Sequence, residues 1–107
     1  MGDSLKALED QYMFLTQQLS LFLAACQTQT QRDDLMTQYV TARRNYWSCV
    51  NKIFHEDDPR VISLVRQMHD EQAKIEDCTN HLDKISQVID IITKAVTAGT
   101  KLAALAG

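Results

Sequence analysis

The stretch His55-Glu56-Asp57-Asp58-Pro59 divides the 107-residue chain near its midpoint and contains its only proline. An Asp side chain can accept hydrogen bonds from the free N–H groups at the start of a helix, and proline suits the first helical position because it lacks an N–H group. The sequence therefore predicts a turn over residues 55–58 and a helix that begins at Pro59.

On both sides of this turn, apolar residues recur at alternating spacings of three and four, which keeps them on one face of an α-helix. In the first half they are Leu5, Leu8, Tyr12, Leu15, Leu19, Phe22, Cys26, Met36, Val40, Trp47, Val50 and Phe54. In the second half they are Val61, Leu64, Met68, Ile75, Cys78, Leu82, Ile85, Ile89, Ile92, Val96 and Ala103. We expect this stripe to be buried, Trp47 included; the alternative for Trp47 is an interface anchor beside Arg44 and Tyr46.

The polar segment 27–31 interrupts the first stripe but contains neither Gly nor Pro. The seven-residue register of Leu19 and Cys26 continues at Val40 and Trp47, and a loop of arbitrary length would reset it. We therefore predict an all-α chain with one helix over about residues 4–54 and another over about 59–103. These helices would form a long antiparallel, coiled-coil-like hairpin in a single domain over 1–107. The alternative is a three-helix bundle with a break near 27–31.

Each stripe contains one charged residue near the turn, Arg43 in the first half and Glu71 in the second. In a hairpin folded about residues 55–58, these two residues would lie in the same layer or in adjacent layers. A buried pair of opposite charges adds little net stability but disfavours a shifted register. We therefore predict a core polar pair between Arg43 and Glu71; the alternative is that Arg43 extends to solvent along the core.

A two-helix hairpin buries only one stripe per helix, so we expect a second copy to complete a four-helix bundle as a homodimer. Apolar residues outside the main stripes would form that interface, or bind a different protein. Phe14, Leu21, Val88, Ile91 and Leu102 lie toward the open end of the hairpin, and Tyr39 and Tyr46 form a seven-spaced row nearer the turn.

The net charge of −3 and the absence of a Lys/Arg run argue against nucleic acid as a partner. Residues 55–107 carry the whole excess of negative charge, with nine acidic and six basic residues. No stretch is long and uncharged enough to span a bilayer, and residues 85–106 lack the basic polar face of a membrane-surface helix, so membrane binding is disfavoured. The three widely spaced cysteines fit a reducing, cytoplasmic compartment; secretion without a cleavable signal peptide is the alternative.

No catalytic motif emerges, and we expect neither an enzyme nor a bound cofactor. A di-iron bundle needs Glu-x-x-His pairs, and no Glu here is followed by His at that spacing. Cys78 and His81 lie one helical turn apart and could ligate zinc with help from another chain. We interpret them instead as a core cysteine beside a surface histidine, so no metal site is predicted.

The expected function is a non-enzymatic protein–protein interaction module, a helical-hairpin adaptor or chaperone-like protein that binds its partner through coiled-coil packing. A metal-binding helical bundle is one alternative. A second comes from outline alone: in length the chain resembles the small secreted helical-hairpin substrates of type VII secretion, whose turn carries Trp-x-Gly. Trp47-Ser48-Cys49 lacks that Gly and precedes the predicted turn by about ten residues.

Overall fold

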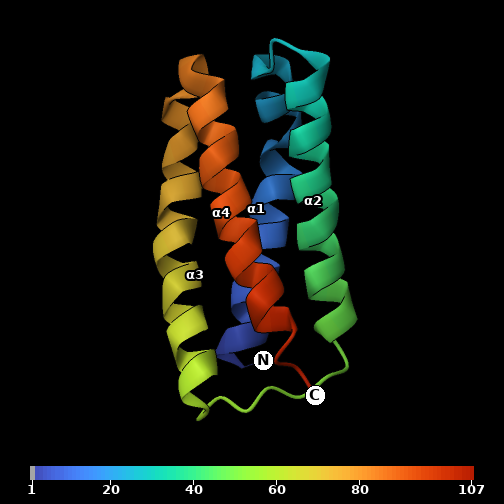
Figure 1. The fold of residues 1–107 in the computed structure, drawn as a ribbon, viewed down its shortest axis with the longest axis vertical. Helices are drawn as coiled ribbons and strands as arrows, with labels where there is room; N and C mark the ends of the chain where they lie inside the picture. The colour runs from blue at the N-terminus through green and yellow to red at the C-terminus, as the bar shows by residue number, and fades with distance from the viewer. Residues whose placement is uncertain (1) are drawn as a thin grey trace.

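The computed structural model describes residues 2–107, and every regular element in that range is helical (Figure 1). Four α-helices follow one another along the chain: α1 (Asp3–Ala25), α2 (Gln29–Cys49), α3 (Pro59–Asp77) and α4 (Ile85–Ala103). Two short 3-10 turns, η1 (Cys78–Asn80) and η2 (Leu82–Lys84), join α3 to α4. The predicted all-α class is confirmed.

The chain reverses direction at each of its three connections, so α1 and α2 form one antiparallel pair and α3 and α4 form another (Figure 1). Around the bundle, α2 packs on α1 and α4, and α3 packs on α1 and α4. The connection over residues 50–58 therefore crosses the base of the bundle to reach α3. Both chain ends lie at this base (Figure 1). The molecule measures 42 × 22 × 19 Å.

The predicted continuous helix over 4–54 is wrong. It breaks after Ala25 and resumes at Gln29, within one or two residues of the alternative break. Thr28 and Gln31 form a reciprocal capping box: the Gln31 N–H donates to Thr28 Oγ1 at 3.1 Å, and the Thr28 N–H donates to Gln31 Oε1 at 3.3 Å. Local side-chain capping thus starts a new helix without Gly or Pro. This helix also ends early, at Cys49.

The second predicted helix, over 59–103, is interrupted as well. His81 has φ −133° and ψ 35°, outside the helical region. Beside it, Thr79 Oγ1 donates to the Glu76 carbonyl at 3.1 Å and Asn80 Nδ2 donates to Asp77 Oδ1 at 3.4 Å. Short polar side chains that bond locally compete with helix continuation. The hairpin of two long helices is therefore folded back on itself into four shorter ones.

The boundary at Pro59 is confirmed. Asp58 is the N-cap of α3, and its Oδ1 accepts a hydrogen bond from the Arg60 N–H at 2.8 Å. The Arg60 guanidinium lies 2.8 Å from Asp58 Oδ2. These contacts, with the Arg60 side chain as the largest cause, lower the pKa of Asp58 from 3.8 to about 2.

The core divides into two clusters along the bundle axis. One surrounds Phe22, Leu35 and Ile92, and the other surrounds Leu8 and Leu102. Most of the second predicted stripe is buried, but the first stripe is buried or half-buried from Leu5 to Cys26, whereas Met36, Val40 and Trp47 are exposed. Both clusters exclude solvent almost completely, so the single chain forms a closed hydrophobic core without a second copy.

Polar side chains lie between the two clusters. Gln11 Nε2 donates to the Ala95 carbonyl at 2.9 Å, and Asn45 Nδ2 donates to Thr100 Oγ1 at 3.0 Å. Gly99 makes room for them, since a Cβ at that position would lie 2.9 Å from Gln11 Oε1. Gln11 Oε1 itself is buried without a hydrogen-bond partner among the described residues. This layer links α1, α2 and α4.

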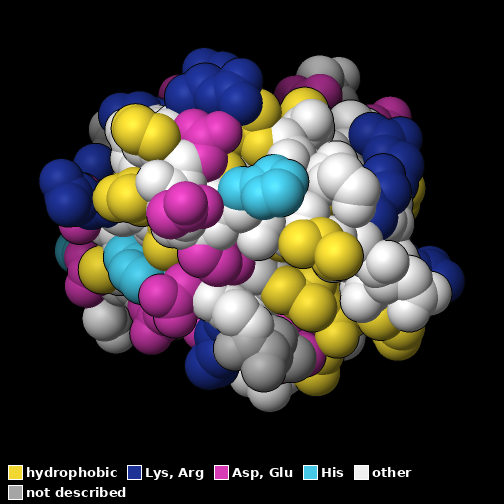
Figure 2. All heavy atoms as spheres, turned by 90° about the horizontal axis from the view of Figure 1, so that it is seen from below, with side chains coloured by type: hydrophobic (Ala, Val, Ile, Leu, Met, Phe, Trp, Pro, Cys, Tyr) yellow, Lys and Arg dark blue, Asp and Glu magenta, His cyan; other side chains and the backbone are white. Residues whose placement is uncertain are grey.

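The connection across the base is tied at two points. Glu56 accepts hydrogen bonds from Ser4, the second residue of α1, and the backbone of Ile53 pairs with Gly107 through two 2.9 Å hydrogen bonds. Figure 2 shows this end of the molecule, where acidic, basic and histidine side chains surround apolar patches. Because both signs of charge mix there, the base carries no single-sign surface.

Candidate functional site

Helix α2 presents apolar side chains on two faces. Leu35, Ala42 and Cys49, seven residues apart, point into the core and are at most 1% exposed. Met36, Val40 and Trp47 belong to the stripe that we predicted to be buried, and they are 37%, 49% and 58% exposed. The core position predicted for Trp47 is therefore wrong. Three of the seven exposed large hydrophobic residues of the described chain share one face of this helix, which is unusual for a surface without a partner.

These residues belong to a longer row on the outward side of α2, which we call the outer stripe. Its spacing alternates between four and three residues, and all of its members are exposed: Gln29, Asp33, Met36, Val40, Arg43 and Trp47. Such spacing is typical of the contact seam of a coiled coil. The outer stripe lies nearly opposite the buried row of the same helix.

Tyrosines from α1 and α2 connect the outer stripe to the bundle. Tyr12 stacks on Tyr46 with ring centroids 5.8 Å apart, and it lies 6.1 Å from Tyr39. Tyr46 and Trp47 pack in a T-shaped arrangement, with their ring centroids 5.1 Å apart. The three tyrosines are half-buried. Aromatic packing of this kind restrains the indole of Trp47 and so preorganises the exposed face.

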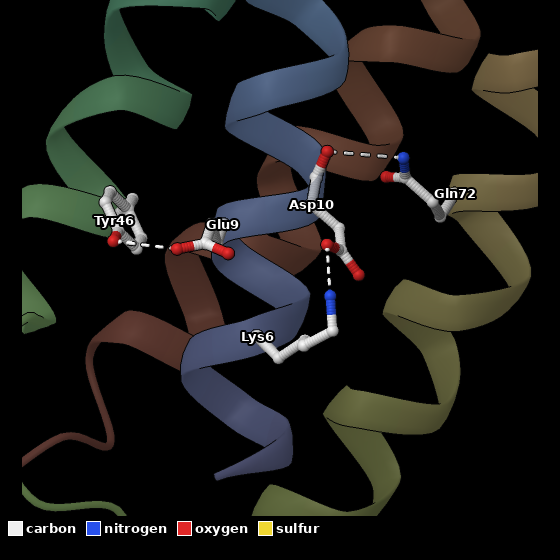
Figure 3. Close-up of polar contacts among 5 residues, drawn as sticks. All are labelled: Lys6, Glu9, Asp10, Tyr46 and Gln72. Atoms are coloured by element: carbon white, nitrogen blue, oxygen red, sulfur yellow. Dashed lines mark hydrogen bonds and ion pairs between the residues drawn. The ribbon is translucent and has the colours of Figure 1, made fainter. Parts of the chain in front are cut away.

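Polar contacts hold α1 in place behind this cluster (Figure 3). The hydroxyl of Tyr46 donates to Glu9 Oε2 at 3.0 Å, and this contact is the largest cause of the raised pKa of Tyr46. On the other side of α1, Gln72 Nε2 donates to the Asp10 carbonyl at 3.4 Å. The pKa of Tyr12 is lowered, chiefly by its interaction with the Trp47 side chain.

A shallow hollow of about 280 Å³ lies at the C-terminal end of the outer stripe, bounded by Val40, Arg43, Arg44 and Trp47. Among residues 2–107, no carboxylate lies within 4.0 Å of the guanidinium of Arg43 or of Arg44. The hollow therefore combines apolar walls with two cations that have no acidic partner among the residues that the structure describes. A larger groove of about 640 Å³ between α3 and α4 is bordered by Leu64 and Leu105, which are both half-buried.

The predicted Arg43–Glu71 pair does not form. Glu71 is 4% exposed on α3 and lies near two lysines instead, 3.5 Å from Lys74 Nζ and 3.7 Å from Lys94 Nζ. Its Oε2 has no hydrogen-bond partner among the described residues. Arg43 is exposed on the outer stripe. The breaks after Ala25 and Asp77 place α4, not α2, beside α3, and this removes the layer in which the pair was expected.

The other predicted interface residues lie in several places. Val88 and Leu102 are 1% and 0% exposed, so they belong to the core and not to an interface. Phe14 and Ile91 are half-buried against the same core. Leu21 is 42% exposed on α1. Only Tyr39 and Tyr46 lie at the aromatic cluster. We did not predict from the sequence that the outer stripe faces solvent. A signal for it was present, because Leu35, Ala42 and Cys49 form a second seven-spaced row on the same helix, and only one of the two rows can face the core.

The Cys78–His81 pair lies beside a hollow of about 270 Å³ at the α3–α4 connection. Cys78 is 2% exposed, and burial raises the pKa of its thiol. His81 Nε2 lies 3.1 Å from Asp77 Oδ2 at the surface. Within residues 2–107, no three His, Cys, Asp or Glu side chains are grouped as a metal-binding cluster would require. The interpretation of Cys78 as a core residue and His81 as a surface residue is confirmed.

Comparison with protein-family models, with curated proteins and with solved structures finds no match to this chain. Over the described residues, none of the helices has both the length and the apolar character needed to cross a bilayer.

Proposed function

We propose that this protein is a non-enzymatic protein–protein interaction module, an adaptor or chaperone-like protein whose binding surface is the outer stripe of α2. The single observation that carries this proposal is the exposure of Met36, Val40 and Trp47 on a helix that already buries a second apolar row. A partner helix laid along the outer stripe would cover these side chains. Trp and Arg, both present here, supply much of the binding energy in protein interfaces.

The structure of the core changes the reason for expecting a homodimer. The sequence predicts that two hairpins combine into four helices, but residues 2–107 of a single chain already form four helices around their own core. A second copy would therefore have to pack against an outer face. The α2 surface is the candidate, because the residues expected at the open end, such as Val88 and Leu102, are buried.

Three buried free thiols support a reducing compartment such as the cytoplasm. Cys26, Cys49 and Cys78 are at most 8% exposed and unpaired. The alternative of a secreted hairpin similar to type VII substrates rested on a two-helix outline. The four helices of the described chain do not support that outline.

Site-specific photo-crosslinking in the native cell tests the proposal. A photoreactive benzoylphenylalanine is placed at position 47, and the matched control is the same group at position 62, because Ile62 is also an exposed apolar residue (44%) but lies on α3. We expect a defined protein adduct from position 47 and none from position 62. Equal adducts from both positions, or no adduct from position 47, would contradict an interaction surface on α2.

A further inference from the structure

Building on the interaction function proposed above, we propose that the outer stripe of α2 packs antiparallel against the outer stripe of a second copy of this chain. The stripe runs from Gln29 to Trp47 with coiled-coil spacing, and each of its six residues is exposed. It is about 27 Å long at 1.5 Å per residue, enough for a two-helix seam. Its apolar centre, Met36 and Val40, is exposed by 37% and 49%.

The spacing of the residues in the outer stripe is the same when it is followed from either end of α2. Its spacing is symmetric about residue 38, so a two-fold axis at that level pairs each residue with one on the second helix. Met36 then faces Val40 of the other copy, and Asp33 faces Arg43. Gln29 faces Trp47 at each end of the seam. An isologous interface requires such self-complementarity. Here the central apolar residues face each other, and each acidic residue faces a basic one.

The hollow at the C-terminal end of the stripe fits this arrangement. Val40, Arg43, Arg44 and Trp47 stand at positions i, i+3, i+4 and i+7, the four residues that form one hole in knobs-into-holes packing. At the level of this hole, the antiparallel second copy presents Asp33. A carboxylate would therefore enter a hole bounded by two guanidinium groups that lack an acidic partner within residues 2–107.

Charge also sets the direction of the pairing. A parallel pair in register would bring Asp33 beside Asp33 and Arg43 beside Arg43, and like charges facing each other in an interface are unfavourable. The antiparallel pair brings opposite charges together twice. Among the described residues, the Asp33 side chain accepts a hydrogen bond from the neutral Gln29 Nε2 at 2.8 Å and makes no ion pair, so it can receive an arginine of the second copy.

The test is the mass of the purified full chain by light scattering and sedimentation, over a series from about 5 to about 500 µM, since small interfaces dissociate in this range. We expect the mass to rise from 12.2 kDa toward twice that value. Two charge reversals, Asp33→Arg and Arg43→Glu, should each raise the dissociation constant at least about tenfold, because each creates two like-charge contacts.

The decisive experiment mixes the two charge-reversal variants. A D33R chain and an R43E chain are each expected to be monomeric, but together they restore both pairs of opposite charge and should form a heterodimer. The matched controls are Asp34→Arg, in the same turn but off the stripe, and Arg66→Glu on α3; both residues are exposed, and neither change should alter the dimer. Circular dichroism of each variant checks that the bundle remains folded.

The outcomes separate this inference from the function on which it rests. A monomer at every concentration, a dimer indifferent to D33R and R43E, or a mixture that does not associate overturns the self-pairing. If position 47 nevertheless crosslinks a different protein in the cell, the interaction function remains and its partner is not a second copy. A monomer that also gives no adduct at position 47 overturns both.

Discussion

The side chain of Glu56 caps the first helix: its Oε2 accepts a hydrogen bond from Ser4 Oγ at 2.7 Å, and its Oε1 accepts one from the Ser4 N–H at 3.2 Å. Ser4 is 0% exposed, so its hydroxyl has no access to solvent. Its acceptor, Glu56, belongs to the connection over residues 50–58 that crosses the base of the bundle. The free N–H groups at the start of a helix attract a carboxylate. A residue 52 positions away thus takes the role that a local N-cap normally has.

This relationship predicts that Glu56→Ala lowers the free energy of unfolding by about 1–2 kcal/mol, because the buried Ser4 hydroxyl and N–H lose their acceptor. Urea denaturation measures the change. Asp57→Ala is the matched control, since Asp57 is exposed in the same connection. Equal losses from the two substitutions would show that the cap contributes no stability.

The cap of α3 predicts a pH dependence. The pKa of Asp58 is 3.8 unfolded and about 2 folded, so its contribution is present above about pH 4 and is lost as the pH falls toward 2. We expect the urea midpoint of the wild type to fall more between pH 4 and pH 2 than that of Asp58→Asn, which can still cap the helix without a charge. If the urea midpoints of the two proteins fell equally between pH 4 and pH 2, the Asp58 carboxylate charge would not contribute to stability.

The capping box at the start of α2 predicts that Thr28→Ala costs about 1 kcal/mol of unfolding free energy. The substitution removes the acceptor for the Gln31 N–H. Thr37→Ala serves as the control, because Thr37 is also exposed on α2 but its hydroxyl donates to the carbonyl of Asp33 and caps no helix end. If Thr28→Ala were no more destabilising than Thr37→Ala, a different feature would have to hold the break after Ala25.

The polar layer predicts non-additive effects at Gly99 and Gln11. Gly99→Ala would place a Cβ 2.9 Å from Gln11 Oε1 and 3.4 Å from Met68 Cε, and we expect a loss of about 1–2 kcal/mol from overpacking. In a Gln11→Ala background the same substitution should instead raise stability by about 1 kcal/mol, because Ala favours the helix more than Gly. Equal effects in both backgrounds, measured by a double-mutant cycle, would exclude the contact.

The buried carboxylate of Glu71 predicts a neutral or stabilising substitution. Glu71→Gln removes a charge whose two lysine contacts are long, 3.5 and 3.7 Å, and whose Oε2 has no partner among residues 2–107. We expect unfolding free energy to change by less than about 1 kcal/mol, or to rise, because the desolvation cost of the carboxylate disappears. Lys94→Met, which leaves the carboxylate with one lysine, should destabilise. A loss above about 2 kcal/mol for Glu71→Gln would show that the lysine pairs are strongly stabilising.

Local sequence signals predicted the features that depend on neighbouring residues. The Asp58-Pro59 boundary, the all-α class and the buried thiols of Cys26 and Cys78 agree with the structure. The Thr-x-x-Gln capping box at Thr28 is also a local signal for the helix break, but the prediction of one continuous helix rests on the register of Cys26, Val40 and Trp47 and on the lack of Gly and Pro. Of the residues in that register, Cys26 lies in the core, whereas Val40 and Trp47 belong to the outer stripe.

The sequence by itself determined that this chain forms helices, where the third helix begins, and which face of the second half is buried, because each depends on residues within a few turns of one another. Only the tertiary structure decided which of the two seven-spaced rows on α2 points inward. The row Leu35, Ala42, Cys49 and the row Val40, Trp47 both suit a helix, and the choice depends on the space left by α1 and α4. Small side chains such as Ala42 and Cys49 fit between closely packed helices, whereas Trp47 does not. The same packing placed Lys94 beside Glu71 and left Arg43 on the surface.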